Sequence, residues 1–99
     1  MQHNNTPADV RSMSYNDRVI QMQGSLTNRG FDIVAFQNAP RQSGFWMVVV
    51  DNQGHKLTDA QIDHVADIID PFGFDVDDTY ESPKYMGMTT IQCPCNINP

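Results

Sequence analysis

Eight carboxylates gathered in one span are the residues of this chain best suited to chemistry or charge recognition. They are Asp59, Asp63, Asp67, Asp70, Asp75, Asp77, Asp78 and Glu81. No lysine or arginine lies between Lys56 and Lys84. Such a group predicts a negative surface, and we expect these residues to bind a protein partner that has a basic surface. The alternative is a solvated face that keeps the chain soluble and pairs with Arg18 and Arg29 of a neighbouring helix.

The aspartates from Asp59 to Asp70 have helical spacing. At 100° per residue they occupy an arc of about 80°, beside the apolar stripe of the same segment. Like charges four residues apart destabilise a helix by about a few tenths of a kcal/mol per pair. The arrangement therefore works slightly against the stability of the helix.

Recognisable catalytic patterns are absent from the sequence. No glycine-rich phosphate loop follows an expected strand, and no nucleophile elbow is present. Asp77 and Asp78 are adjacent, and neighbouring residues of a strand face opposite ways, so these two carboxylates cannot readily share a proton or a metal. We expect a protein that is not an enzyme.

The residue types of a zinc site are present, but their spacing is wrong. Cys93, Cys95, His55 and His64 match no zinc finger or ribbon. In a strand the two cysteine Cα atoms would lie about 6.5 Å apart, near the limit for a disulfide. His64 is expected to point away from the core and the sheet. The prediction is reduced thiols, no metal and no cofactor.

Composition limits the partners. The chain has 99 residues, a net charge of −6 and a pI of about 4.6. Proteins that bind the phosphate backbone carry the opposite charge balance, so direct binding to DNA or RNA is disfavoured. The longest apolar run, 45–50, is too short to cross a bilayer, and residues 1–12 lack the apolar core of a secretory signal. We expect a cytoplasmic protein.

The apolar run 45–50 predicts a second contact surface. In a strand, Phe45, Met47 and Val49 face one way and the intervening residues face the other. If helices cover only the first face, the opposite face exposes an apolar set of Trp46, Val48 and Val50, joined by Val34 and Phe36 of the paired strand. Exposed apolar patches mark interfaces, and a symmetric homodimer is the simplest case. The alternative is that the tail or a terminal segment covers this face.

A segment of the chain occurs twice at an offset of 43 residues, 73 − 30. Gly30-Phe31-Asp32 matches Gly73-Phe74-Asp75, and the same offset aligns Pro40 with Pro83, Gly44 with Gly87, Arg41 with Lys84, Ile33 with Val76 and Val48 with Ile91. Because glycine and proline fix turns, we expect two repeat units, 14–53 and 57–96, that bend alike. Together they form one domain, 14–98, behind a disordered polar tail, 1–13.

The first unit predicts a helix followed by a hairpin. Ser14 is the expected N-cap, and Gly30 ends the helix because glycine adopts positive φ readily. The buried stripe of this helix is Tyr15, Val19, Met22 and Leu26. Segments 31–37 and 44–50 are rich in β-branched and aromatic residues, and the polar turn between them indicates that they pair.

The second unit predicts the same order of elements. Thr58 and Gln61 have the spacing of a capping box, and Pro71 ends the helix. The buried stripe is Ile62, Val65, Ala66 and Ile69. Two further strands, 74–80 and 86–93, follow.

The order αββαββ predicts a two-layer α+β fold. It is similar to a permuted ferredoxin-like chain, in which a four-stranded sheet carries both helices on one face. The second strand of each hairpin would lie in the centre of the sheet, and segments 31–37 and 74–80 would form its edges. This fold hosts many unrelated functions, so the similarity implies no activity.

The resulting hypothesis is a non-catalytic acidic protein-binding module. Its narrowest form is a small phage-type inhibitor whose carboxylates occupy the basic nucleic-acid-binding surface of a host defence complex. An alternative is a small-ligand-binding regulatory domain that acts as a dimer. A third is an enzyme subunit whose active site is completed by another chain.

Overall fold

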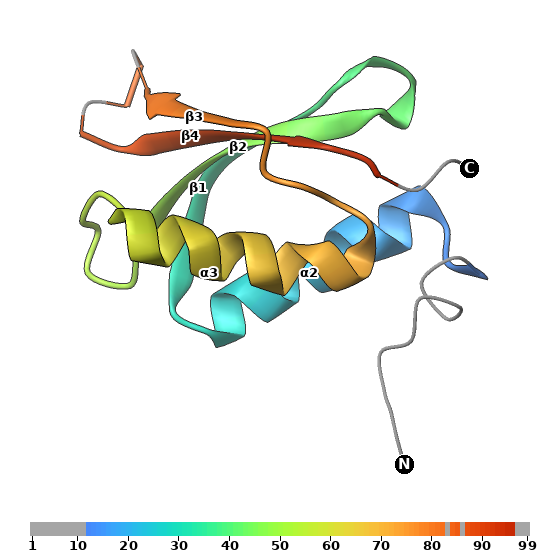
Figure 1. Cartoon of the computed structure of the whole chain (residues 1–99), viewed down its shortest axis with the longest axis horizontal. Coiled ribbons are helices and arrows are strands. Elements are labelled where there is room, and N and C mark those ends of the chain that lie inside the picture. Colours follow the sequence, from blue (N-terminus) through green and yellow to red (C-terminus); the bar gives the residue numbers. More distant parts are fainter. Residues whose placement is uncertain (1–11, 83, 86, 97–99) are drawn as a thin grey trace.

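Two helices cover one face of a four-stranded sheet (Figure 1). The structure is a computed structural model and describes residues 12–82, 84–85 and 87–96. Its elements are α2 (Tyr15–Asn28), β1 (Phe31–Asn38), β2 (Gly44–Asp51), α3 (Asp59–Ile69), β3 (Asp78–Glu81) and β4 (Thr89–Pro94). Short 3-10 turns at Pro40–Gln42 and Asp70–Phe72 follow β1 and α3. The expected tail lies largely outside the described residues.

The sheet is antiparallel throughout, with the order β1-β2-β4-β3. The second strand of each hairpin is therefore central and the first is at an edge, as the sequence predicts. Both helices pack beneath the sheet, and α2 contacts α3 (Figure 1). The predicted αββαββ fold is confirmed.

The helix ends follow the predicted capping residues. The Ser14 hydroxyl accepts a hydrogen bond from the Asp17 N–H, and the capping box of Thr58 and Gln61 has both of its hydrogen bonds. Gly30 and Gly73 follow the helical segments with φ of 91° and 89°. Side-chain caps of this kind are each worth about 1 kcal/mol. Local sequence therefore sets where both helical segments begin and end.

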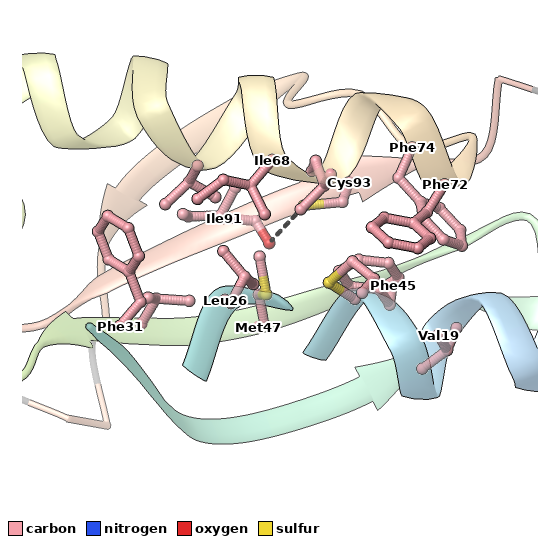
Figure 2. Close-up of a cluster of buried hydrophobic side chains, with 14 of the residues drawn as sticks. Val19, Leu26, Phe31, Phe45, Met47, Ile68, Phe72, Phe74, Ile91 and Cys93 are labelled. Atoms are coloured by element: carbon pink, nitrogen blue, oxygen red, sulfur yellow. Dashed lines mark hydrogen bonds between the residues drawn. The ribbon is translucent and has the colours of Figure 1, made fainter. Parts of the chain in front are cut away.

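The core lies between the helices and one face of the sheet. The face of β2 predicted to be buried is buried, because Phe45 and Met47 are each 1% exposed and Val49 is 0% exposed. Cys93 and Ile91 of β4 are the partners of Phe45 and Met47 and lie in the same cluster (Figure 2). All four residues of the predicted α2 stripe are buried: Tyr15, Val19, Met22 and Leu26. A fully buried side chain of this size contributes roughly 1.5–3 kcal/mol.

The buried stripe of α3 differs from the prediction because it contains Ile68 in place of Ala66. Val65 and Ile69 are buried as expected, but Ile68 is buried and Ala66 is only half-buried. Ile62 is also half-buried and packs against the core. The prediction for Ala66 was wrong because the larger Ile68 turns toward the sheet and places Ala66 at the margin.

A β-bulge in β1 reverses the predicted direction of Phe36. The register of β1 with β2 shifts between Ile33 and Ala35, so Val34 is the extra residue. Phe36 then lies opposite Met47, and its ring stacks on that of Phe45 at 4.8 Å. The expectation that Phe36 belongs to the open face was wrong, because one inserted residue reverses the side-chain alternation.

The second hairpin is less regular than predicted. Ladder pairing of the expected strand 74–80 covers only Asp78–Glu81, preceded by an isolated bridge from Phe74 to Cys95. The N–H groups of Asp75 and Asp77 still donate to the carbonyls of Pro94 and Gln92. The segment therefore follows β4 with an irregular register. The following strand starts at Thr89, and its predicted start at Met86 lies outside the described residues.

The repeat offset holds at the helix–strand junctions and fails in the central strands. Phe31 and Phe74, which follow Gly30 and Gly73, are both buried. Val48, however, lies opposite Thr90 on the face without helices, whereas Ile91 lies opposite Met47 in the core. The expected equivalence of Val48 and Ile91 is therefore wrong by one residue. The first strand of each hairpin is irregular, so the number of residues between the helix and the second strand does not match between the two units.

Candidate protein-binding surfaces

A groove lined by carboxylates lies between α3 and the segment that leads to β3. It has a volume of about 380 Å³. The lining residues are Ala66, Asp67, Asp70, Asp75, Val76, Asp77 and Pro94. We call this the acidic groove. It brings together half of the predicted partner-binding residues, from a helix and from an extended segment.

The chain geometry around Gly73 makes the acidic groove. Gly73 adopts left-handed φ after the 3-10 turn, which returns the chain along β4. The Asp75 carboxylate is held by the Asn96 side-chain amide, with an Nδ2 to Oδ1 distance of 2.7 Å. Asp67 lies in the last turn of α3, and Asp70 follows directly. Backbone geometry thus fixes the two walls of the groove against each other.

The carboxylates of the acidic groove have no internal counterion among the described residues. In the described ranges, the basic side chain found within 4.0 Å of a carboxylate is that of His55, whose Nδ1 lies 3.8 Å from Oδ2 of Asp51, and neither residue lines the acidic groove. Asp67 and Asp70 also lie at the C-terminal end of α3, where the helix dipole disfavours anions, and the last turn contains no basic residue. An external cation placed here would therefore relieve an unfavourable charge arrangement.

Arg18 does not neutralise the acidic surface. Its side chain is 5% exposed, and Nη1 donates to the Phe72 carbonyl oxygen at 3.0 Å. The guanidinium lies over the Phe74 and Tyr15 rings at 5.2 and 5.7 Å, and both terminal nitrogens are 3.7 Å from the Cys95 sulfur. The buried Arg18 side chain thus links α2 to residues of the second unit.

Arg29 does not neutralise the acidic surface either. It is exposed, and its backbone N–H caps α2 by donating to the Leu26 and Thr27 carbonyls. Within the described part of the chain, neither Arg18 nor Arg29 forms an ion pair with an aspartate. The alternative of internal pairing is therefore not observed there.

The other predicted acidic residues lie outside the acidic groove. Asp59 is in the first turn of α3, where a negative charge is favourable, and Asp63 is exposed on the same helix. Asp78 pairs with Gln92 and thereby faces the side of the sheet without helices. Glu81, at the end of β3, is exposed. The eight residues therefore form a groove and several separate charges rather than one site.

The open face of the sheet is less exposed than the sequence predicts. Val48 and Val50 are 7% and 3% exposed, and Trp46 is half-buried. Of the five predicted interface residues, Val34 alone is classed as exposed, at 41%. The expectation of a broad apolar patch of Trp46, Val48 and Val50 was wrong, because both valines are buried. Tyr80, Lys84 and Tyr85 line the same depression as Val48.

Aromatic side chains surround a shallow depression on this open face. Its volume is about 480 Å³. Its lining residues are Ala35, Phe36, Gln37, Trp46, Met47, Val48, Tyr80, Lys84, Tyr85 and Thr90. We call it the aromatic depression. Sequence analysis did not assign Tyr80 or Tyr85 to any site, although the pairing of Tyr80 with Thr90 fixes its face once the register is known.

Cys93, Cys95, His55 and His64 do not come together as a group of metal ligands. Among the described residues no group of three potential ligands is close enough to hold a metal ion. No disulfide joins Cys93 to Cys95. Burial, and secondarily the charge of Asp75, raises the pKa of the Cys93 thiol to about 12, which opposes thiolate ligation.

His64 is exposed but does not point away from the sheet. Its ring meets that of Phe31, the first residue of β1, edge to face at 5.7 Å. The predicted direction of His64 was wrong because the end of α2 and the start of β1 reach the flank of α3.

The comparisons with known proteins assign no family. No protein family model matches the chain, and no curated protein or solved structure is matched by it. Neither helix in the described ranges is long and apolar enough to span a membrane. The functional proposal therefore depends on the geometry and charge of the surfaces described above.

Proposed function

We propose that this protein is a non-catalytic binding module whose acidic groove binds a lysine- or arginine-rich segment of another protein. The observation that supports this is the convergence of Asp67, Asp70, Asp75 and Asp77 on one groove without a counterion from the described residues. Val76 and Ala66 supply apolar contact for the stems of long basic side chains.

Charge magnitudes set the expected strength of this binding. An exposed ion pair contributes roughly 0.2–1 kcal/mol, so four contribute about 1–4 kcal/mol. Charges at an interface rim act mainly on the association rate and on salt dependence. We expect binding that weakens steeply as ionic strength rises, with tight binding requiring further contacts outside the acidic groove.

A narrower form of the proposal is an inhibitor that mimics nucleic acid. Carboxylates on a small rigid surface would then occupy the basic site where a host defence complex binds phosphates. This form makes a distinct prediction, since a DNA or RNA duplex should compete with the protein for its partner. Binding that is unaffected by saturating duplex would exclude this form while leaving the binding module intact.

The acidic groove can be tested with a defined basic probe. We would measure the fluorescence anisotropy of a labelled oligolysine peptide with wild-type protein and with the variant Asp67→Asn, Asp70→Asn, Asp75→Asn and Asp77→Asn. The matched control removes the same charge at Asp17, Asp32, Asp59 and Asp63, which are exposed and outside the acidic groove.

The groove variant should raise the Kd by about tenfold or more at low salt, and the control by about threefold or less. Equal weakening by the two variants would mean that only net charge attracts the probe, which would contradict the proposal. Wild-type protein that does not bind at low salt would contradict it as well. Circular dichroism would verify that both variants are folded.

A second candidate function concerns the aromatic depression. Trp46, Tyr80 and Tyr85 surround a volume of about 480 Å³, within the range of small-molecule sites. A regulatory domain could bind a planar metabolite there by stacking. A thermal-shift screen should then find a compound that raises the Tm with increasing dose, and Trp46→Ala should abolish the shift.

A further inference from the structure

In the part of the chain that the structure describes, the β1 edge of the sheet exposes apolar side chains. Large exposed apolar side chains in the described ranges are Ile20 at 64%, Val34 at 41% and Tyr80 at 45%. Ile20 belongs to α2 and Val34 to β1, and the groove between these elements has a volume of about 520 Å³. Its lining includes Gln23, Thr27 and residues 32–36. We call this strip the α2/β1 edge.

Among the described residues, no close contact requires a glycine at position 24 of α2. Gly24 lies in the interior of the helix, and a Cβ added there would meet nothing within 4 Å. Glycine at such a position destabilises a helix by about 1 kcal/mol relative to alanine. At 100° per residue, Ile20, Gly24 and Thr27 lie on one stripe of α2. Thr27 of this stripe lines the groove together with Gln23, so the stripe borders the β1 edge.

β1 also has little of the charge, and none of the shortness, that protect many edge strands. It is eight residues long and contains one charge, Asp32, whereas β3 is four residues long and begins and ends with carboxylates. Long apolar edges invite another strand, and charge or shortness prevents this. The bulge at Val34 interrupts pairing with β2 and leaves this side chain exposed.

We propose that two copies of this chain associate through the α2/β1 edge, with the two β1 strands antiparallel and the two α2 helices in contact across Gly24. The sheet order places the acidic groove on the far side, so this contact separates the negative surfaces of the copies as widely as the fold allows. Keeping two acidic grooves apart matters only when both partners carry one, so this placement favours a second copy of the chain over an unrelated partner.

Charge at the ends of β1 is self-complementary in this arrangement. Asp32 lies at the start of β1, and the exposed Arg41 lies in the turn just after it. In an antiparallel pair the start of one strand meets the end of the other. Asp32 of one copy would therefore face Arg41 of the other, twice about the two-fold axis.

Sedimentation equilibrium across a range of concentrations tests the proposal on the full chain. Val34→Lys should raise the dimer Kd by about tenfold or more, because lysine at an edge opposes strand addition. Gly24→Ala should weaken the dimer while raising the Tm of the monomer. Tyr80→Lys, at the opposite edge with similar exposure, should leave the Kd unchanged.

The register is tested by a charge exchange. Asp32→Arg alone should weaken the dimer, and Asp32→Arg combined with Arg41→Asp should restore it. If Val34→Lys proves unfolded by circular dichroism, Ile20→Lys takes its place, since Ile20 is the more exposed residue. Wild-type protein that is monomeric into the submillimolar range, or a dimer that only Tyr80→Lys disrupts, would overturn the proposal. Neither result would affect oligolysine binding at the acidic groove.

Discussion

The two edges of the sheet occupy equivalent places in the fold and have opposite surfaces. β1 is eight residues long, exposes Val34 and contains one charge. β3 is four residues long and lies within a run of carboxylates that includes Asp75, Asp77 and Glu81. Packing therefore constrains the interior of each αββ unit, while the length and charge of its edge strand can differ.

The two units share the same junction between helix and first strand, although their edge strands differ. Gly30 and Gly73 adopt nearly the same φ, 91° and 89°, and each precedes a buried phenylalanine. The surroundings of these two rings still differ. Phe74 has edge-to-face contacts with Tyr15 and Phe45, whereas one aromatic contact, with His64, is found for Phe31 among the described residues.

Substitution of the two matched phenylalanines should give the largest effects. Phe74→Ala should lower the free energy of unfolding by about 3–5 kcal/mol, because it leaves a cavity at the centre of the core. Phe31→Ala should cost about 1 kcal/mol less, since its ring has fewer aromatic partners. Urea unfolding followed by tryptophan fluorescence measures both.

If Phe74→Ala is too unstable to measure, Phe74→Leu and Phe31→Leu should preserve the same order at smaller magnitude. Equal losses at the two positions would show that the units are energetically equivalent despite their different contacts.

The buried thiol of Cys93 predicts an alkaline loss of stability. The folded-state pKa of Cys93 is raised to about 12 from an ordinary value of 9.0, first by burial and then by Asp75. Because folding favours the neutral thiol, its stabilising effect is complete below about pH 9 and is lost between about pH 9 and 12, at up to about 1.4 kcal/mol per pH unit.

Cys93→Val provides the comparison for this effect. Between about pH 8 and pH 10.5 the wild type should lose roughly 1–2 kcal/mol more than the variant, measured by urea unfolding. Burial, the largest cause, raises the pKa of Tyr15 in both proteins, and the charge of Cys93 adds to that rise in the wild type alone. Parallel pH profiles would contradict a desolvated Cys93.

Neutralising one aspartate on α3 should give the smallest effect, and it should raise the free energy of unfolding where the other changes lower it. Asp63 has like-charged neighbours four residues away on both sides, Asp59 and Asp67. Asp63→Asn should therefore raise the free energy of unfolding by about 0.5 kcal/mol at low salt. Asp32→Asn on β1 should change it by less, because no such pair is present there.

Thermal unfolding with and without about 1 M NaCl separates these two variants, since salt screens exposed charges. A gain for Asp63→Asn that persists in high salt would identify a cause other than repulsion.

Local chemistry made the fold predictable. Ser14, Thr58 and Gln61 predicted both helix starts, and the alternation of residues 45–50 predicted which face of β2 is buried. The central position of β2 and β4 followed from the order of elements alone. These signals are readable because each depends on residues within a few positions of one another.

The errors came from effects that local patterns do not contain. The bulge at Val34 depends on how β1 fits β2, and it reversed the face of Phe36. The burial of Val48 depends on neighbouring strands and the β3–β4 connection. The sequence predicted the carboxylates of the acidic groove but not their separation from Asp78 and Glu81, because that division depends on tertiary contacts of Gly73 and β4.

The pairing of β2 with β4 is the contact that would hold two fragments of this chain together if the chain were cut between its units. Six residue pairs between β2 and β4, from Gly44–Pro94 to Val49–Thr89, hold the two αββ units together. The polar segment that contains His55 and Lys56 connects the two units along the chain. A lone two-stranded hairpin is marginal in water. Cleaving that connector would yield two fragments that each lack an inner neighbour strand, so their reassembly upon mixing would make this small fold a split reporter of proximity.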